Sequence, residues 1–133
     1  MVKTKIGLDT SFFVVLYGKG EKAKEIWTKI VEGERNGVIS LFSIFELRRL
    51  ALRGVISKDF CNALFQAFKD GVCEVRALTW ELLEEAANLS WGTGLPAADS
   101  IIYASCKDCS EFYTADTDFI EKIQKKKPKV VLL

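Results

Sequence analysis

Short apolar segments typical of β-strands alternate with segments of helical periodicity along the whole chain. The strand-like segments are residues 2–8, 38–42, 73–78, 111–115 and 129–133. The helix-like segments, with their caps, are residues 10–17, 21–35, 43–53, 57–69, 79–91, 96–107 and 117–125. This alternation predicts a three-layer α/β/α sandwich around a central, mainly parallel sheet of about five strands. Continuous apolar strands favour the same fold, because helices would cover both faces of the sheet.

The length of the chain and its N-terminal segment limit its organisation and location. A chain of 133 residues without a linker-like tract is expected to form a single domain over residues 1–133. The apolar run at residues 12–17 is shorter than the roughly 20 residues that a membrane span needs. Asp9 would interrupt the apolar core of a signal peptide. We therefore expect a cytoplasmic protein that does not enter a membrane.

The charged residues exclude several classes of function. The 19 basic and 18 acidic residues leave a net charge of +1, which argues against a protein that coats nucleic acid through overall charge. The chain has no histidine, which excludes histidine-based triads, histidine general bases and histidine-containing zinc sites.

The four cysteines include one Cys-x-x-Cys pair, Cys106 and Cys109, which we interpret as idle thiols because a structural zinc site needs a second ligand pair. Whether this pair forms a disulfide stays open.

Five carboxylates fall where the predicted sheet would bring them to one edge. Asp9 ends the first strand, Glu46 lies one turn into the helix after the second, and Asp116 and Asp118 follow the fourth. Asp99 lies near the start of the helix that leads back into the fourth strand, so it belongs to the same edge. Close like charges need a neutralising partner, and Mg²⁺ or Mn²⁺ prefers oxygen ligands. Such ions assist phosphodiester hydrolysis, which requires no histidine.

Each of these acids also has a purely structural interpretation. Ser43 and Glu46 have the spacing of a capping box, in which the glutamate would only satisfy the start of a helix. Asp9 and Asp116 could each cap the helix that follows, and Asp99 and Asp118 suit the positive end of a helix dipole. These separate roles do not explain why acids occur at every loop that feeds one edge.

Four segments together resemble the PIN domain family, and within it the VapC-like toxins of prokaryotic toxin–antitoxin pairs. They are GLDTSF at residues 7–12, SIFEL at 43–47, PAADSIIYA at 96–104 and YTADTDF at 113–119. PIN domains are typically Mg²⁺- or Mn²⁺-dependent ribonucleases. The resemblance therefore implies an endoribonuclease that acts on RNA, forms a homodimer and, as a toxin, is inhibited by a small antitoxin protein.

The resemblance also implies roles for individual residues. The catalytic and metal-binding acids would be Asp9, Glu46, Asp99 and Asp116, with Asp118 as an accessory metal ligand. The small polar residues beside them would orient a carboxylate or a water molecule; these are Thr10, Ser11 and Thr114. We expect hydrolysis by a metal-activated water, with Glu46 either a ligand or a proton acceptor.

Two other surfaces could serve RNA or a partner. The candidate RNA-binding residues are Arg48, Arg49, Arg53 and Lys125, although these charges could equally belong to solvated faces, and Arg48 and Arg49 point to different sides of a helix. Phe60, Phe65 and Phe68 share one helix, where core packing is favoured over a partner surface. If Phe68 lies in the core, Phe68→Glu should give an insoluble product.

Two alternative functions stay open at this stage. A catalytically silent PIN module would bind RNA or a protein partner, but the complete acidic set disfavours it. Phosphoryl transfer through an aspartyl phosphate could use Asp9, yet the hydrolases that form one typically have Asp-x-Asp where this chain has Asp9-Thr10-Ser11.

Overall fold

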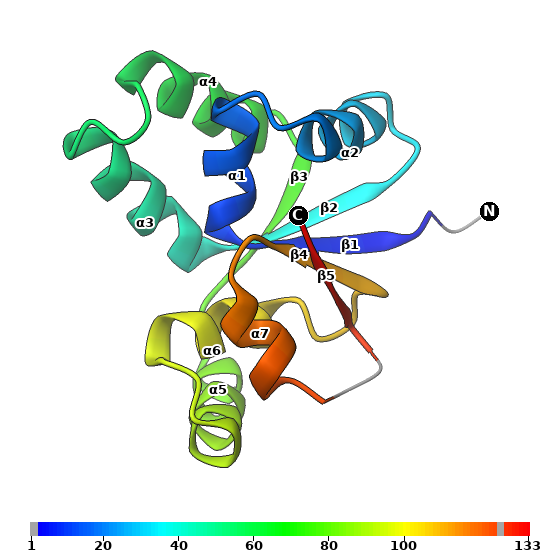
Figure 1. Ribbon diagram of the computed structural model, residues 1–133, viewed down its shortest axis with the longest axis vertical. Coiled ribbons are helices and arrows are strands. Elements are labelled where there is room, and N and C mark those ends of the chain that lie inside the picture. The colour runs from blue at the N-terminus through cyan, green and yellow to red at the C-terminus, as the bar shows by residue number, and fades with distance from the viewer. Residues whose placement is uncertain (1–2, 125–126) are drawn as a thin grey trace.

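A five-stranded parallel sheet forms the centre of the computed structural model, which describes residues 3–124 and 127–133 (Figure 1). The strands follow the spatial order β3-β2-β1-β4-β5, and every neighbouring pair is parallel. Their bounds are β1 Lys5–Leu8, β2 Asn36–Ser40, β3 Cys73–Arg76, β4 Glu111–Thr114 and β5 Lys129–Leu132. The predicted sheet is thereby confirmed in strand number and direction.

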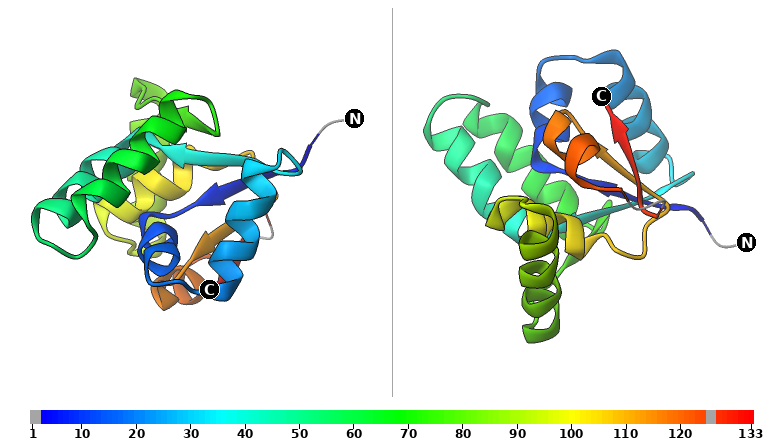
Figure 2. Two further views of the ribbon diagram at one scale, coloured as in Figure 1. Left: turned by 90° about the horizontal axis from the view of Figure 1, so that it is seen from above. Right: turned by 60° about the horizontal axis from the view of Figure 1, so that its bottom comes forward.

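Helices cover both faces of this sheet (Figures 1 and 2). Four pack on one face: α1 Thr10–Tyr17, α2 Glu21–Val31, α3 Leu41–Leu52 and α4 Lys58–Lys69. The other face carries α5 Trp80–Thr93, α6 Ala97–Ser105 and α7 Thr117–Lys122. None of the described helices combines the length and apolar character that a membrane crossing requires.

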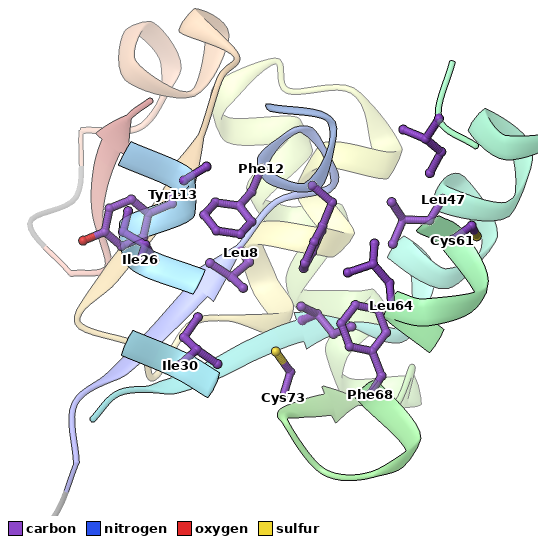
Figure 3. Close-up of a cluster of buried hydrophobic side chains, with 14 of the residues drawn as sticks. Leu8, Phe12, Ile26, Ile30, Leu47, Cys61, Leu64, Phe68, Cys73 and Tyr113 are labelled. Atoms are coloured by element: carbon purple, nitrogen blue, oxygen red, sulfur yellow. The ribbon is translucent and has the colours of Figure 1, made fainter. Parts of the chain in front are cut away.

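Alternating strand residues feed the two cores. Ile39 and Tyr113 point into the core under α1–α4, whereas Val38 and Phe112, their neighbours in sequence, pack under α6 and α7. This is the period of two that a strand imposes on its side chains. Figure 3 shows the larger core, in which side chains of the sheet meet residues of α1, α2, α3 and α4.

Strand β1 approaches helix α6 very closely at Gly7. A Cβ atom added to Gly7 would lie 2.7 Å from both Cβ and Sγ of Cys106 and 3.0 Å from the Phe112 ring. Such contacts leave no room for a side chain. Glycine is therefore required here for packing, since its backbone does not adopt a positive φ.

Several predicted boundaries differ from the structure. Helix α2 ends at Val31 rather than at residue 35, because a turn with Gly33 at φ +82° follows it. Strand β2 begins at Asn36 rather than at residue 38, because Asn36 and Gly37 already pair with β1. Helix α7 ends at Lys122, and residue 125, the predicted end, lies outside the described residues.

Phe68 of helix α4 and the four cysteines are buried in the interior. Phe68 is only 6% exposed and packs edge-on against Phe13 at a centroid distance of 5.5 Å, so core packing is confirmed over a partner surface for this residue. The chain's four cysteines are buried free thiols, including Cys106 and Cys109.

The strand order creates one special position at the carboxyl edge of the sheet. From β1 the chain moves outward to β2 and β3, and then returns to the other side of β1 to form β4. The loops after β1 and β4 therefore leave the sheet in different directions and leave a crevice between them, which is where parallel α/β sheets bind ligands.

Candidate functional site

A pocket of about 420 Å³ lies at this crevice. Four of the predicted acids line it, and they come from four separate elements: Asp9 after β1, Glu46 on α3, Asp99 on α6 and Asp116 after β4. Residues up to 107 positions apart in sequence thus share one cavity because the parallel strands all end at this edge. The structure brings the four acids together, and their chemical role stays a prediction.

Asp9 forms the most enclosed wall of the pocket. Its side chain caps helix α1, since Oδ1 accepts a hydrogen bond from the Thr10 amide at 2.7 Å. Its Oδ2 accepts hydrogen bonds from the Ser11 hydroxyl at 2.9 Å and the Thr114 hydroxyl at 2.7 Å. Burial raises the pKa of Asp9, while these three hydrogen bonds oppose the rise. Asp9 is therefore both a helix cap and a pocket residue, with its carboxylate held in one orientation.

The hydroxyl groups of the predicted supporting residues also fix the loop after β4. The Ser11 hydroxyl accepts the Ala115 amide at 2.9 Å, and the Thr114 hydroxyl accepts the Asp116 amide at 3.0 Å. The loops after β1 and β4 are thereby joined through side chains that also hold Asp9. Thr114 itself is fully buried and does not line the pocket, so its contribution acts through these hydrogen bonds.

Glu46 is held by Thr10 and does not cap its helix. Helix α3 begins two residues earlier than predicted, with Ser40 as its cap, because the Ser40 hydroxyl accepts the Phe42 amide at 3.2 Å. The capping box of Ser43 and Glu46 is therefore wrong. Instead, the Thr10 hydroxyl donates to Glu46 Oε1 at 2.6 Å and also lies 3.1 Å from the Ser43 hydroxyl. Partial burial raises the pKa of Glu46, and the Thr10 hydrogen bond opposes this.

Asp99 faces the other acids from the first turn of α6. Burial comes first among the causes that raise its pKa to about 6, followed by the negative charges of Asp9, Asp116, Glu46 and Asp118. Among residues 3–124 and 127–133, no side chain donates a hydrogen bond to its carboxylate. Among the four acids that line the pocket, Asp99 is thus the one whose charge is least compensated by the described residues.

Asp116 and Asp118 have the helix-terminal positions that the sequence suggested. The Asp116 carboxylate caps α7 by accepting the Asp118 amide at 2.9 Å, and it also lines the pocket. Asp118 is half-buried in the first turn of α7 and does not line the pocket, although its charge contributes to the raised pKa of Asp99. An accessory role for Asp118 is therefore electrostatic in this structure.

The predicted basic residues divide between two faces of α3. Arg49 and Arg53 line the pocket, whereas Arg48 turns toward α4, donates to Asn62 at 3.0 Å and lies over the Phe65 ring at 4.9 Å. Arg48 is thus directed away from the pocket, as the helical geometry requires for neighbouring positions. Lys125 lies outside the described residues.

Sequence reasoning missed the apolar wall of the pocket. Phe42, Phe45 and Leu50 line it beside the arginines, and Phe45 is 56% exposed. The signal was available, because residues 42, 45, 46, 49, 50 and 53 share one face at helical spacing. The predicted start of α3 at residue 43 obscured this pattern, because it placed Phe42 in a strand.

The donor set of the pocket suits a hard divalent cation. Its acidic side chains offer only oxygen ligands, and four carboxylates outnumber the two arginines of the lining. In the part of the chain that the structure describes, no three acidic or thiol side chains are close enough to hold an ion directly as they stand. Mg²⁺ usually keeps several water ligands and binds one or two carboxylates, so the residues present fit a hydrated ion.

Comparisons with known proteins agree with this architecture. The family model of the PIN domain matches residues 6–125. No curated protein matches the sequence significantly. A solved toxin–antitoxin complex from Klebsiella pneumoniae contains a similar chain, with a TM-score of 0.70, 21% identity and coverage of 95% of both chains.

Two further solved structures have a similar fold. VapBC2 from Rickettsia felis, bound to a DNA fragment from its promoter, gives a TM-score of 0.72 at 12% identity, over 98% of this chain and 99% of that one. VapC20 from Mycobacterium tuberculosis is described as a toxin that cleaves the sarcin–ricin loop. It gives a TM-score of 0.70 at 21% identity, over 91% of this chain and 97% of that one. At these identities the similarity concerns the fold.

Proposed function

Because the chain belongs to the PIN domain family, we propose that it is a divalent-metal-dependent endoribonuclease that hydrolyses RNA phosphodiesters. The observation that carries the proposal is the convergence of Asp9, Glu46, Asp99 and Asp116 on one pocket at the crevice between β1 and β4. A cluster of four carboxylates in a chain without histidine suits metal-assisted hydrolysis better than acid–base catalysis by side chains alone.

Asp9, Asp99 and Asp116 would hold Mg²⁺ or Mn²⁺, directly or through water, with Asp118 supporting them through its charge. When bound, the ion would orient the phosphodiester, lower the pKa of an attacking water and stabilise the leaving oxygen. Thr10 occupies one oxygen of Glu46, which leaves Oε2 to bind the ion or to accept a proton from water. Ser11 and Thr114 would keep the Asp9 carboxylate oriented throughout.

The biological setting that we propose is the toxin of a toxin–antitoxin pair. The structural similarity to chains from two toxin–antitoxin complexes and to a sarcin–ricin loop-cleaving toxin supports this setting. The partners would then be cytoplasmic RNA, a small antitoxin that covers the pocket and a second copy of the chain in a homodimer.

The proposal is tested by RNA cleavage in Mg²⁺ or Mn²⁺, with and without EDTA. We expect cleavage that EDTA abolishes and excess metal restores. Glu46→Gln keeps an acceptor for the Thr10 hydroxyl but removes the charge, so it should cleave far more slowly. Glu85→Gln is the matched control, because Glu85 is paired with Lys107 on the surface and does not line the acidic pocket.

Cleavage that resists EDTA would contradict the metal mechanism. Full activity of Glu46→Gln together with normal metal dependence would instead contradict the role proposed for Glu46. If no RNA is cleaved under any condition, the catalytically silent binding module becomes the better description.

A further inference from the structure

One face of helix α3 combines aromatic rings with positive charge at the mouth of the acidic pocket. Phe42, Phe45, Arg49 and Arg53 follow one another at intervals of three and four residues, so they share one face of the helix, and all four line the pocket. Asp99 and Asp116 line the same cavity from other elements. The pocket therefore has an aromatic and basic wall as well as an acidic one.

The Phe45 ring is not packed into the protein core. It is 56% exposed, although a phenylalanine side chain is usually buried. Its nearest aromatic neighbour, Phe42, lies at a centroid distance of 5.6 Å with a tilt of 36° between the rings. The Arg49 guanidinium lies over the Phe45 ring at 6.0 Å. An exposed ring with a guanidinium beside it is the combination that proteins use to stack nucleic-acid bases.

The charges of the two walls indicate which part of a nucleotide each would bind. The acidic wall repels phosphate unless a cation intervenes, as the mutual effect of its carboxylates on the pKa of Asp99 indicates. The α3 wall instead offers an apolar ring for a base and two guanidinium groups for phosphate oxygens. A nucleotide carries both an uncharged planar base and an anionic phosphate, so it matches the α3 wall.

We infer that Phe45 stacks against an unpaired base of the RNA substrate, next to the phosphodiester that is cleaved, with Arg49 at the adjoining phosphate. The inference rests on the proposed function and adds to it a residue that would recognise an unpaired base. Bases inside a helix are already stacked on both sides, so a protein ring can reach only bases that are splayed out of it. Duplex RNA would lack this contact.

Binding can be measured separately from cleavage. The probe is a fluorescently labelled RNA hairpin with a long single-stranded loop, compared with a blunt duplex of the same stem, by fluorescence anisotropy in EDTA at low ionic strength. Phe45→Leu removes the ring but keeps an apolar side chain, and Phe45→Trp restores a larger ring. Trp80→Leu is the matched control, because Trp80 is 77% exposed but does not line the pocket.

We expect Phe45→Leu to weaken binding of the looped hairpin about tenfold, which corresponds to the loss of one stacked base. Phe45→Trp should bind at least as tightly as the wild type, and Trp80→Leu should be unchanged. Binding of the blunt duplex should be weaker than that of the hairpin and insensitive to position 45.

Equal affinities of Phe45→Leu and wild type, or equal binding of hairpin and duplex, would overturn the inference and leave the ring to a protein partner. Failure of the proposed function looks different. In that case loop binding and its dependence on Phe45 would persist, while no RNA would be cleaved in Mg²⁺ or Mn²⁺.

Discussion

The two ends of helix α6 carry aspartates in opposite electrostatic surroundings. Asp99 in the first turn faces other carboxylates, and its pKa is raised to about 6, first by burial and then by those charges. Asp108, just after the helix, receives two hydrogen bonds from the Arg76 guanidinium at 2.9 and 3.1 Å, and this pairing lowers its pKa to about 2. The helix dipole favours the reverse order, because a negative charge is stabilised at the N-terminus.

Burial together with neighbouring charges therefore outweighs the dipole at Asp99, and the pairing with Arg76 outweighs it at Asp108. Arg76 and Lys5 compensate the charge of Asp108 within the protein, so this carboxylate contributes to folding. The charge of Asp99 has no such partner among the described residues, so a bound cation would have to compensate it. A partly buried carboxylate that faces other carboxylates is a candidate functional group, whereas the ion pair of Asp108 explains its charge structurally.

The largest expected effect is a difference in RNA cleavage between variants at the two ends of α6. Asp99→Asn should lower kcat/KM for RNA cleavage by about 10²–10³, since a metal site contributes several kcal/mol to transition-state stabilisation. Asp108→Asn should leave kcat/KM within about twofold, because the first removes a proposed metal ligand and the second only a surface ion pair. Equal losses in both variants would remove the distinction between the ends.

A smaller effect concerns the stability of the metal-free protein. The folded-state pKa of Asp99, about 6, exceeds its ordinary value of 3.8, so folding takes up a proton between these two values. Stability should therefore rise as the pH falls from above 6 toward 4, and the charged form should cost about 1 kcal/mol at neutral pH after allowance for solvent screening.

Thermal unfolding in EDTA, above and below pH 6, measures this cost. Asp99→Asn should raise the Tm by about 4 °C at neutral pH and flatten the pH dependence, with a residual slope from Asp9 and Glu46, whose pKa values are also raised. A lower Tm for Asp99→Asn at neutral pH would show that the repulsion is not significant.

The smallest effect is expected at the other end. The lowered pKa of Asp108 means that its ion pair stabilises the fold above pH 4 and that this contribution is lost as the pH falls toward 2. Because the Asp108 side chain is 45% exposed, Asp108→Asn should lower the free energy of unfolding by only about 0.5–1 kcal/mol. Urea denaturation at low and high salt checks this, and a difference that salt does not diminish would argue against an electrostatic origin.

The sequence predicted well those features that depend on the order of elements. The positions of Asp9 and Asp116 at strand ends followed from the parallel sheet, as did the delivery of Asp99 to the same edge. The family resemblance pointed to the same residues, and the family is now shown by its match over residues 6–125.

Features that depend on a choice between neighbouring residues could not be predicted. Ser40 and Ser43 are both good helix caps, and only the register of β2 decides that Ser40 is used. The contact between Thr10 and Glu46 and the exposure of Phe45 follow from that choice. Helix propensity carries no information about such tertiary contacts.

The close approach at Gly7 joins two segments that lead to the pocket. Asp9 lies two residues beyond Gly7, and Asp99 lies on α6. Gly7 packs against Cys106, the residue that directly follows this helix. Because Gly7 has no side chain, β1 and the end of α6, which lead to Asp9 and Asp99, lie in direct contact. A residue without any chemistry of its own thereby limits how far evolution or design can vary this strand, because even one added methyl group would force β1 and the end of α6 to shift while every carboxylate of the pocket was retained.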